Sequence, residues 1–285
     1  MPSRNIETLL LILPIALALF AGHALYASYS STGEFLHKDI DLSGGVQLTV
    51  HYSKKLDVPA MEDALKKELS TKDIRIRTST DPTTGVQKTI SIEAGVSDEK
   101  PLEAAVGKYL GMTLSNDNRS ISQFNPAMAA SFWAQVQRAF VWAFALMSLL
   151  IFFYFRNVRA SVSLIFPTML NMFVSIGLMS FFGVSLSLAT FAAIMMLLGY
   201  GIDSNIVLAN NVLKKHEGTV DERIANARRT GFTMVGTTFA ALGAMYFFST
   251  SPVLQSISMV LILGLLSDLV NTWVLNVYLL KRFCL

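Results

Sequence analysis

The chain has few of the residues on which disulfide, metal and catalytic chemistry depend. Cys284 is its single cysteine, so no disulfide can form within the chain. Its four histidines are scattered, and His37 and His51 stand alone in a polar segment. No phosphate-binding loop, paired-histidine zinc motif or nucleophile elbow is present, so this chain cannot draw energy from nucleotide hydrolysis. We expect no enzymatic activity, no cofactor, no metal site and no nucleic-acid partner.

Charge is also scarce. Charged residues make up 15% of the 285 residues and hydrophobic residues 52%, whereas about a quarter of an ordinary globular chain is charged. Six apolar runs are each long enough for a membrane span of roughly 20 residues. They cover about residues 7–28, 131–155, 160–182, 186–212, 231–249 and 254–280. The first run lacks a small-residue cleavage site at its end, so we interpret it as a retained anchor.

The basic residues predict the topology. They flank the first and last spans and fill the connections between spans two and three and between spans four and five. The short connections around 183–185 and 249–252 carry no charge. The positive-inside rule therefore predicts that both termini are cytoplasmic and that the polar segment lies outside. The expected units are an anchor (1–29), an extracytoplasmic domain (30–127) and a five-helix transmembrane block (128–285).

Alternating and helical patterns predict a small α+β domain between the first two spans. Strands are expected at 46–52, 74–78 and 88–93, with a turn at 81–85 and amphipathic helices at 58–69 and 99–110. This order suggests a domain of ferredoxin-like type. The predicted fold class is therefore a six-span helical membrane bundle with a small extracytoplasmic ferredoxin-like domain. Gly44 and Gly45, just before the first strand, fit a tight turn or a close backbone approach.

The fourth span holds the main anomaly, because Asp203 and Asn205 lie near its middle. An ionised carboxylate at bilayer depth costs roughly 2.5–3.5 kcal/mol on insertion scales. Such a residue usually faces a bundle interior or a watery cavity and handles ions or protons. The alternative is a neutral, hydrogen-bonded Asp203 that holds helices together.

The sixth span repeats this anomaly with Asp268 and Asn271, which are i, i+3 neighbours on one face. Asp268 either belongs to a proton relay or is a structural acceptor for Trp273 or a serine. Arg229 stands where the fifth apolar run begins. It either faces water as a positive-inside residue or pairs with the carboxylate of the fourth span.

The fifth span also carries Thr237 and Thr238, together with small residues at four-residue spacing from Gly236. Small residues at that spacing allow close approach of another helix. The threonine hydroxyls are expected either to pack there or to hydrogen-bond to a carboxylate on a neighbouring helix.

Several motifs, in order, resemble those of the SecD/SecF protein-export family. Asp41-Leu-Ser-Gly-Gly45 resembles the signature after its first helix, and Phe124-Asn-Pro-Ala-Met-Ala-Ala-Ser131 resembles its entry into span two. Gly199-Tyr-Gly-Ile-Asp203 resembles its span-four signature, and Arg229-Thr-Gly-Phe-Thr233 with Gly236-Thr-Thr238 resembles that of span five. The resemblance runs over essentially the whole chain, and the size of the polar domain favours the SecF branch.

Two departures accompany this resemblance. The bacterial SecF pattern places its Asp one residue later, where this chain has Ser204, and Asp203-Ser-Asn205 is closer to the pattern of SecD. The segment Asp268-Leu-Val-Asn-Thr-Trp273 resembles the archaeal branch of SecF.

The resemblance implies a non-enzymatic subunit that pairs with SecD into a pseudo-symmetric unit of the resistance-nodulation-division type. Proton passage would then assist export of unfolded polypeptide through the Sec translocation channel, across the bilayer that holds the protein. The implied relay residues are Asp203, Asn205, Arg229 and Asp268. The signature residues with structural roles are Asp41, Gly44, Gly45, Gly199, Thr237 and Thr238. The alternatives are half of a small-molecule or lipid exporter of the same superfamily, and a purely structural scaffold.

Overall fold

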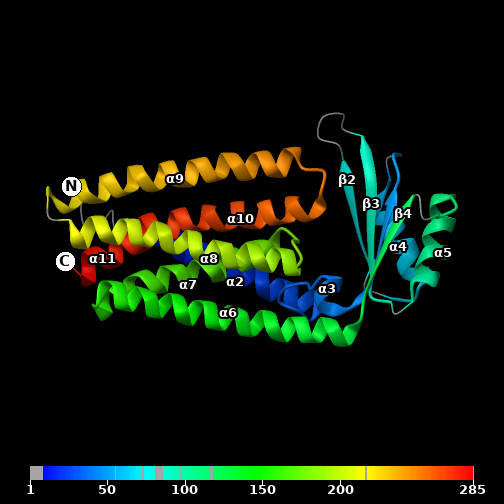
Figure 1. The fold of residues 1–285 in the computed structure, drawn as a ribbon, viewed down its shortest axis with the longest axis horizontal. Coiled ribbons are helices and arrows are strands. Elements are labelled where there is room, and N and C mark those ends of the chain that lie inside the picture. Colours follow the sequence, from blue (N-terminus) through cyan, green and yellow to red (C-terminus); the bar gives the residue numbers. More distant parts are fainter. Residues whose placement is uncertain are drawn as a thin grey trace.

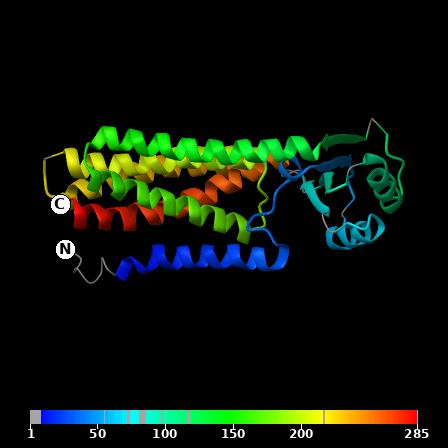
Figure 2. The same cartoon turned by 90° about the horizontal axis from the view of Figure 1, so that it is seen from below.

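The computed structural model describes residues 9–54, 56–71, 74–80, 86–96, 98–115, 118–215 and 217–284. Six helices are long and apolar enough to cross a membrane, as the sequence predicts. They lie side by side as an elongated bundle, with a small α+β domain at one end (Figure 1). Helix α2 begins and helix α11 ends at the opposite end of the bundle, so the first and last spans share that end (Figures 1 and 2).

The spans have the following bounds: α2 Ile12–Thr32, α6 Pro126–Phe155, α7 Val158–Phe181, α8 Leu188–Ala209, α9 Val220–Phe248 and α10 Pro252–Val270. Two π-helical segments, η1 (Asn210–Lys214) and η2 (Asn271–Asn276), continue α8 and α10, and α11 (Val277–Phe283) follows η2. Helices α7, α8 and α10 form the centre of the bundle, whereas α2, α6 and α9 lie at its periphery.

Helix α9 begins at Val220, well before the apolar run expected from residue 231. Thr219 explains this start, because its hydroxyl accepts from the backbone N–H of Glu222 while the Glu222 carboxylate accepts from the Thr219 N–H. This capping box fixes the first turn of the helix. The polar first turns of α9 are therefore helical although they add nothing to the apolar run.

The α+β domain has the order β1 (Gly45–His51), α4 (Val58–Glu68), β2 (Ile74–Thr80), β3 (Gln87–Ala94), α5 (Glu99–Leu110) and β4 (Arg119–Phe124). All pairings are antiparallel, with the sheet order β2-β3-β1-β4. This arrangement confirms an α+β domain and is compatible with the expected ferredoxin-like type. Strand β4 is absent from the sequence prediction, and the expected turn at 81–85 lies outside the described residues.

The two faces of the sheet differ in polarity. Isoleucines, valines and leucines of the strands pack on Met61 and Leu65 of α4 and on Leu102 of α5, and they form the core of the domain. The other face carries polar residues of β1, β2 and β3. Two of them, Arg77 and Ser79 of β2, contact the connections at the near end of the bundle. The domain therefore meets the bundle through a polar surface.

The glycine pair before β1 connects the domain to the bundle. A side chain on Gly44 (φ 85°) would collide with Pro126 at the start of α6, and one on Gly45 (φ 141°) would collide with the backbone of Ala94. Positive φ and these close approaches both require glycine. The short helix α3 (Ile40–Ser43) precedes the pair, and its Asp41 accepts from the N–H of Leu188 at 2.7 Å, which caps α8.

Candidate functional site

A cluster of polar side chains lies in the interior of the membrane block. It is formed by the central helices α7, α8 and α10 with the π-helical segment η2. Asn205 and Asp268 are each only 1% exposed. The buried members are Thr168, Asn171, Asn205, Asp268, Asn271, Thr272 and Asn276. Because polar groups are costly in an apolar interior, their hydrogen bonds decide what the cluster can do.

Asn205 of α8 connects three segments. Its amide Nδ2 donates to Oγ1 of Thr168 on α7 at 2.9 Å. Its Oδ1 accepts from Oγ1 of Thr272 at 3.1 Å and from Nδ2 of Asn276 at 2.6 Å, both on η2. One amide thus joins the three central helices.

Asp268 belongs to the same network through Thr272. The Thr272 Oγ1 lies 3.1 Å from Oδ1 of Asp268 and 3.1 Å from Oδ1 of Asn205. A hydroxyl carries one hydrogen and donates to one of these oxygens at a time. When Asp268 is protonated, its carboxyl donates to Thr272 and Thr272 donates to Asn205, so every group in the series has a partner. Asp268, Thr272 and Asn205 therefore form a continuous hydrogen-bonded series between α10 and α8.

Several polar atoms around Asp268 have no protein partner among the described residues. They are Oδ2 of Asp268, both amide atoms of Asn171 and the Oδ1 atoms of Asn271 and Asn276. A methyl group at Gly201 would lie 3.2 Å from Oδ1 of Asp268 and 3.5 Å from Nδ2 of Asn171. Gly201 therefore lets α8 pass close to both polar side chains.

The π-helical segment η2 begins three residues after Asp268 and carries three members of the cluster, Asn271, Thr272 and Asn276. A π-helical turn is wider than an α-helical turn and is frequent at functional sites. The wide turn aims Thr272 and Asn276 at Asn205. The same turn places Trp273 against α9, where its ring occupies the space of a side chain at Gly231 and stacks on Phe232 at 5.9 Å between ring centres.

The residues predicted for the relay fall on two different surfaces. Asn205 and Asp268 lie in the interior, whereas Asp203 and Arg229 are exposed on the surface of this chain. The salt bridges among the described residues do not include Arg229. The expectation that Arg229 pairs with the span-four carboxylate is therefore not met within this chain.

The exposed face around Asp203 is lined by small and polar residues. On α8, Gly199 lies one turn before Asp203 and is exposed, and a methyl group placed on it would have no neighbour within 4 Å. On α9, Thr237 is exposed and Thr238 is half-buried, and both hydroxyls donate to the backbone oxygen of Met234. These threonines thus bond to their own helix, and the expected bond to a neighbouring carboxylate is not present.

The sequence analysis missed the contribution of α7 to the cluster. Thr168 and Asn171, at i and i+3, face the interior together with Ser175 at i+7. This spacing places three polar residues on one helical face within an apolar run, and it is a signal that the sequence contains. Among the described residues, no group of three or more His, Cys, Asp or Glu side chains could hold a metal ion.

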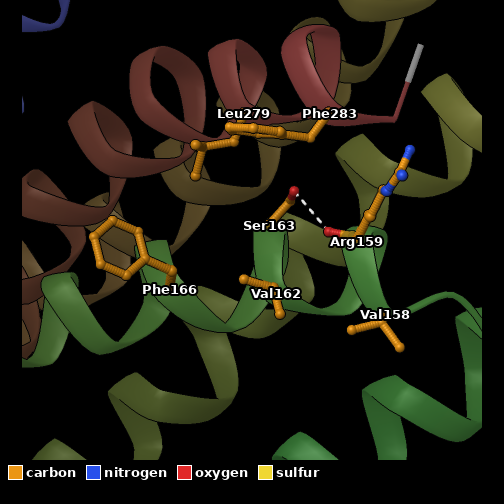
Figure 3. A pocket seen from close by; sticks show the side chains of 7 residues that line it. All are labelled: Val158, Arg159, Val162, Ser163, Phe166, Leu279 and Phe283. Atoms are coloured by element: carbon orange, nitrogen blue, oxygen red, sulfur yellow. Dashed lines mark hydrogen bonds between the residues drawn. The ribbon is translucent and has the colours of Figure 1, made fainter.

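A separate pocket lies between α7 and α11, at the end of the bundle far from the α+β domain (Figure 3). It has a volume of about 280 Å³ and is lined mainly by Val158, Val162, Phe166, Leu279 and Phe283. Its lining is apolar apart from Arg159 and Ser163, and the Ser163 hydroxyl donates to the backbone oxygen of Arg159 at 2.8 Å. This pocket offers no proton acceptor comparable to the central cluster.

The fold and the site define a class: a multi-pass membrane protein with a polar interior and an attached α+β domain. Comparisons with known proteins give the family. Residues 106–284 match the family described as "Protein export membrane protein SecD/SecF, C-terminal". The protein-export membrane protein SecF of Pyrococcus furiosus is 32% identical over 99% of this chain and 91% of its own length. SecF of Haloferax volcanii is 33% identical over 96% of this chain and 90% of its own length.

A solved structure shows the same fold. SecDF from Thermus thermophilus, described as a translocon-associated membrane protein, superposes with a TM-score of 0.73 at 20% identity. The match covers 99% of this chain and 39% of the SecDF chain, so this chain spans about two fifths of that protein. The chain belongs to the SecD/SecF family of protein-export membrane proteins, and its curated relatives are SecF proteins.

Proposed function

We propose that this chain works with SecD as the SecF half of a proton-driven unit that assists protein export. In this proposal the two chains pull on or hold unfolded polypeptide as it leaves the Sec translocation channel. The observation that carries it is the buried series Asp268–Thr272–Asn205 at the centre of the membrane block. One elementary charge crossing the membrane supplies about 2.3 kcal/mol per 100 mV.

The orientation in this proposal has both termini in the cytoplasm and the α+β domain outside. The basic connections support it. Arg156 lies between α6 and α7, Arg159 is in the first turn of α7, and Lys214 and Lys215 follow α8. The α6–α7 connection and the segment after α8 lie at the end of the bundle where α11 ends (Figure 1). Positive charge in short loops favours the cytoplasmic side.

The exposed face of α8 and α9 supports the pairing with SecD. Gly199, Gly236 and Gly243 have no neighbour within 4 Å at the position of a missing side chain, so a second helix has room to approach at these positions. Small residues let a second helix approach closely in a membrane. Asp203 and Arg229 also lie on exposed parts of these helices. In the proposed complex they would lie at the boundary with SecD, while Asp268 stays within this chain.

The test replaces each carboxyl by its neutral isostere, with Asp203→Asn and Asp268→Asn in separate cells. We expect both variants to fold and to co-purify with SecD, and to slow the export of a secreted reporter several-fold. Asp221→Asn is the matched control, because Asp221 pairs with Lys281 at 2.8 Å near the start of α9, away from the cluster.

Normal export in both carboxyl variants would remove the relay from the proposal. Loss of SecD from the purified complex would instead assign the residue to assembly. Purification of the wild-type chain from its native membranes in mild detergent supplies the partner test. Recovery of SecD and the translocation channel supports the proposal, and recovery of a periplasmic adaptor or of this chain alone contradicts it.

A further inference from the structure

The α+β domain meets the bundle through a buried group of charged side chains. Arg77 of β2 lies at its centre. One guanidinium nitrogen is 3.3 Å from Oδ2 of Asp39, and the other is 3.5 Å from Oε1 of Glu93 on β3. Arg77 also donates to the hydroxyl of Ser185, in the connection between α7 and α8. One side chain of the sheet thus touches two carboxyls and the membrane block.

Other contacts fix the same surface to the bundle. The backbone N–H of Asp39 donates to Leu186 at 2.8 Å, and the N–H of Leu186 donates to His37 at 2.7 Å. On β2, the hydroxyl of Ser79 donates to the backbone oxygen of Thr250, between α9 and α10, at 2.8 Å. Two side chains of β2, Arg77 and Ser79, therefore bond the sheet to the connections of the bundle.

The two carboxyls at this surface are close enough to interact directly. Glu93 is 5% exposed, and its carboxyl and that of Asp39 contact the same guanidinium group, that of Arg77. Burial, together with the negative charge of Asp39, raises the pKa of Glu93 to about 8. Although burial opposes ionisation of Asp39 as well, Arg77 and hydrogen bonds from Glu93 and the Ile40 N–H hold the pKa of Asp39 below its usual value.

Arg75 and Lys38 also lie near Glu93, and the salt bridges found among the described residues join neither of them to it. Arg75, its partner across the strands, has its pKa lowered by burial and by the charge of Arg77. Lys38, beside Glu93 in a small cleft that His37 also lines, pairs with Glu34 at 3.1 Å. Protonated Glu93 can therefore donate to the Asp39 carboxylate while Arg77 pairs with Asp39. Ionised Glu93 would instead place two negative charges side by side in a buried place.

We propose that Asp39, Arg77 and Glu93 form a pH-sensitive latch, in which a proton on Glu93 keeps the α+β domain docked on the bundle and its loss releases the sheet. The latch would respond to the pH of the compartment that the α+β domain faces. It requires neither a partner chain nor the central cluster, so it stands apart from the proposed function.

The direction of the pH dependence follows from the two carboxyls. A solvated Glu93 in the released state would return toward its ordinary pKa of 4.5, whereas the docked state holds the proton up to about pH 8. Docking therefore weakens as the pH rises from 4.5 to 8 and changes no further above 8. One proton changes the ratio of docked to released molecules by at most about tenfold per pH unit. Asp39 changes docking in the opposite direction, and only below pH 3.8, its usual pKa, where its protonation removes the ion pair with Arg77.

The experiment measures the distance between domain and bundle in the full chain in lipid nanodiscs. After Cys284→Ser, spin labels are attached through Tyr109→Cys on α5 and Phe248→Cys at the end of α9, both at exposed positions. Pulsed electron resonance then gives distance distributions from pH 5 to pH 9. We expect one narrow distance at pH 5 and a growing second population toward pH 9. Glu93→Gln, which imitates the protonated acid, should keep the narrow distance throughout.

Glu68→Gln is the matched control, because Glu68 pairs with Lys108 at 2.7 Å on the surface of the same domain. It should follow the wild type. Ser185→Ala removes a hydroxyl that accepts from Arg77 and donates to Asp39 at 3.3 Å, without changing any charge, and it should enlarge the released population at every pH. A wild-type distance that does not respond to pH overturns the latch. The latch is also overturned if the distance distribution of Glu93→Gln broadens with pH as that of the wild type does, or if Ser185→Ala leaves the docked population unchanged.

Discussion

Asn276 donates to Asn205 at 2.6 Å, and this bond joins the C-terminal part of α8 to the π-helical segment η2. Asn205 is also bonded to Thr168 and Thr272, so its removal breaks three bonds between helices. Hydrogen bonds between membrane helices contribute about 0.6 kcal/mol each on average. We expect Asn205→Ala to lower the free energy of unfolding in detergent by about 2 kcal/mol, a sum of three such bonds. Asn211→Ala, whose amide donates to the backbone oxygen of Val207 one turn earlier in the same span, should change it far less.

Gly231 and Gly236 on α9 provide a matched pair, because both lie inside the same helix. The ring of Trp273 occupies the side-chain position at Gly231, whereas nothing lies within 4 Å of that position at Gly236. Gly231→Ala should therefore destabilise the chain by about 1–3 kcal/mol through overpacking. Gly236→Ala should stabilise it by up to about 1 kcal/mol, since alanine favours a helix. The midpoint of thermal unfolding, Tm, is measured for both variants. Equal changes in Tm would show that Trp273 does not pack against Gly231.

Asp203 and Asp268 should differ in chemical accessibility. In a Cys284→Ser background, a membrane-permeant maleimide should label Asp203→Cys roughly tenfold faster or more than Asp268→Cys, since a buried thiol is inert. Addition of SecD should then slow the labelling of Asp203→Cys. Leu150→Cys, at an exposed position on α6 on the opposite side of the bundle from α9, should keep its rate. Equal rates at the two aspartate positions would contradict the burial of Asp268.

Asp41 adds to the cap of α8, the helix that carries the candidate relay and whose N-cap residue is Ser187. Its carboxylate accepts from the first N–H of α8, at Leu188. Removal of such a cap costs about 1 kcal/mol. We expect Asp41→Ala to raise amide hydrogen exchange in the first turn of α8 by roughly fivefold, which corresponds to that energy. Exchange in β2 should remain unchanged, and a uniform rise across the chain would indicate general destabilisation instead.

Much of the fold could be predicted because membrane spans and strands leave strong local patterns. The six apolar runs identified the six spans, and alternation identified β1, β2 and β3. Strand β4 was missed because Arg119–Phe124 is short and only half-buried, with no buried apolar face. Its place in the sheet depends on pairing with β1, far away in sequence.

The site was only partly predictable. Asp203, Asn205 and Asp268 attract notice because each is polar in an apolar helix. The direction that each side chain faces could not be predicted, because α8 is apolar on all sides and shows no polar stripe that separates interior from surface. Asp203 and Asn205 are two residues apart, so they point about 200° apart around a helix of 3.6 residues per turn. One therefore faces outward and the other inward. The charged group of Asp39, Arg77 and Glu93 was missed because its members are far apart in sequence.

The packing of α2 bears on how the protein is made. Its main partner is α7, where Gly177 leaves no room for a side chain against Ala21. A chain is synthesised from its N-terminus, so α2 enters the bilayer long before α7 exists. Helix α2 can remain in the bilayer without its partner during this time, because Ile12–Thr32 contains no Asp, Glu, Lys or Arg that another helix would have to shield from lipid. The polar cluster, by contrast, is drawn from helices that follow one another from α7 onward. The buried polar groups of the cluster therefore form their hydrogen bonds only after α7, α8 and α10 have all been synthesised.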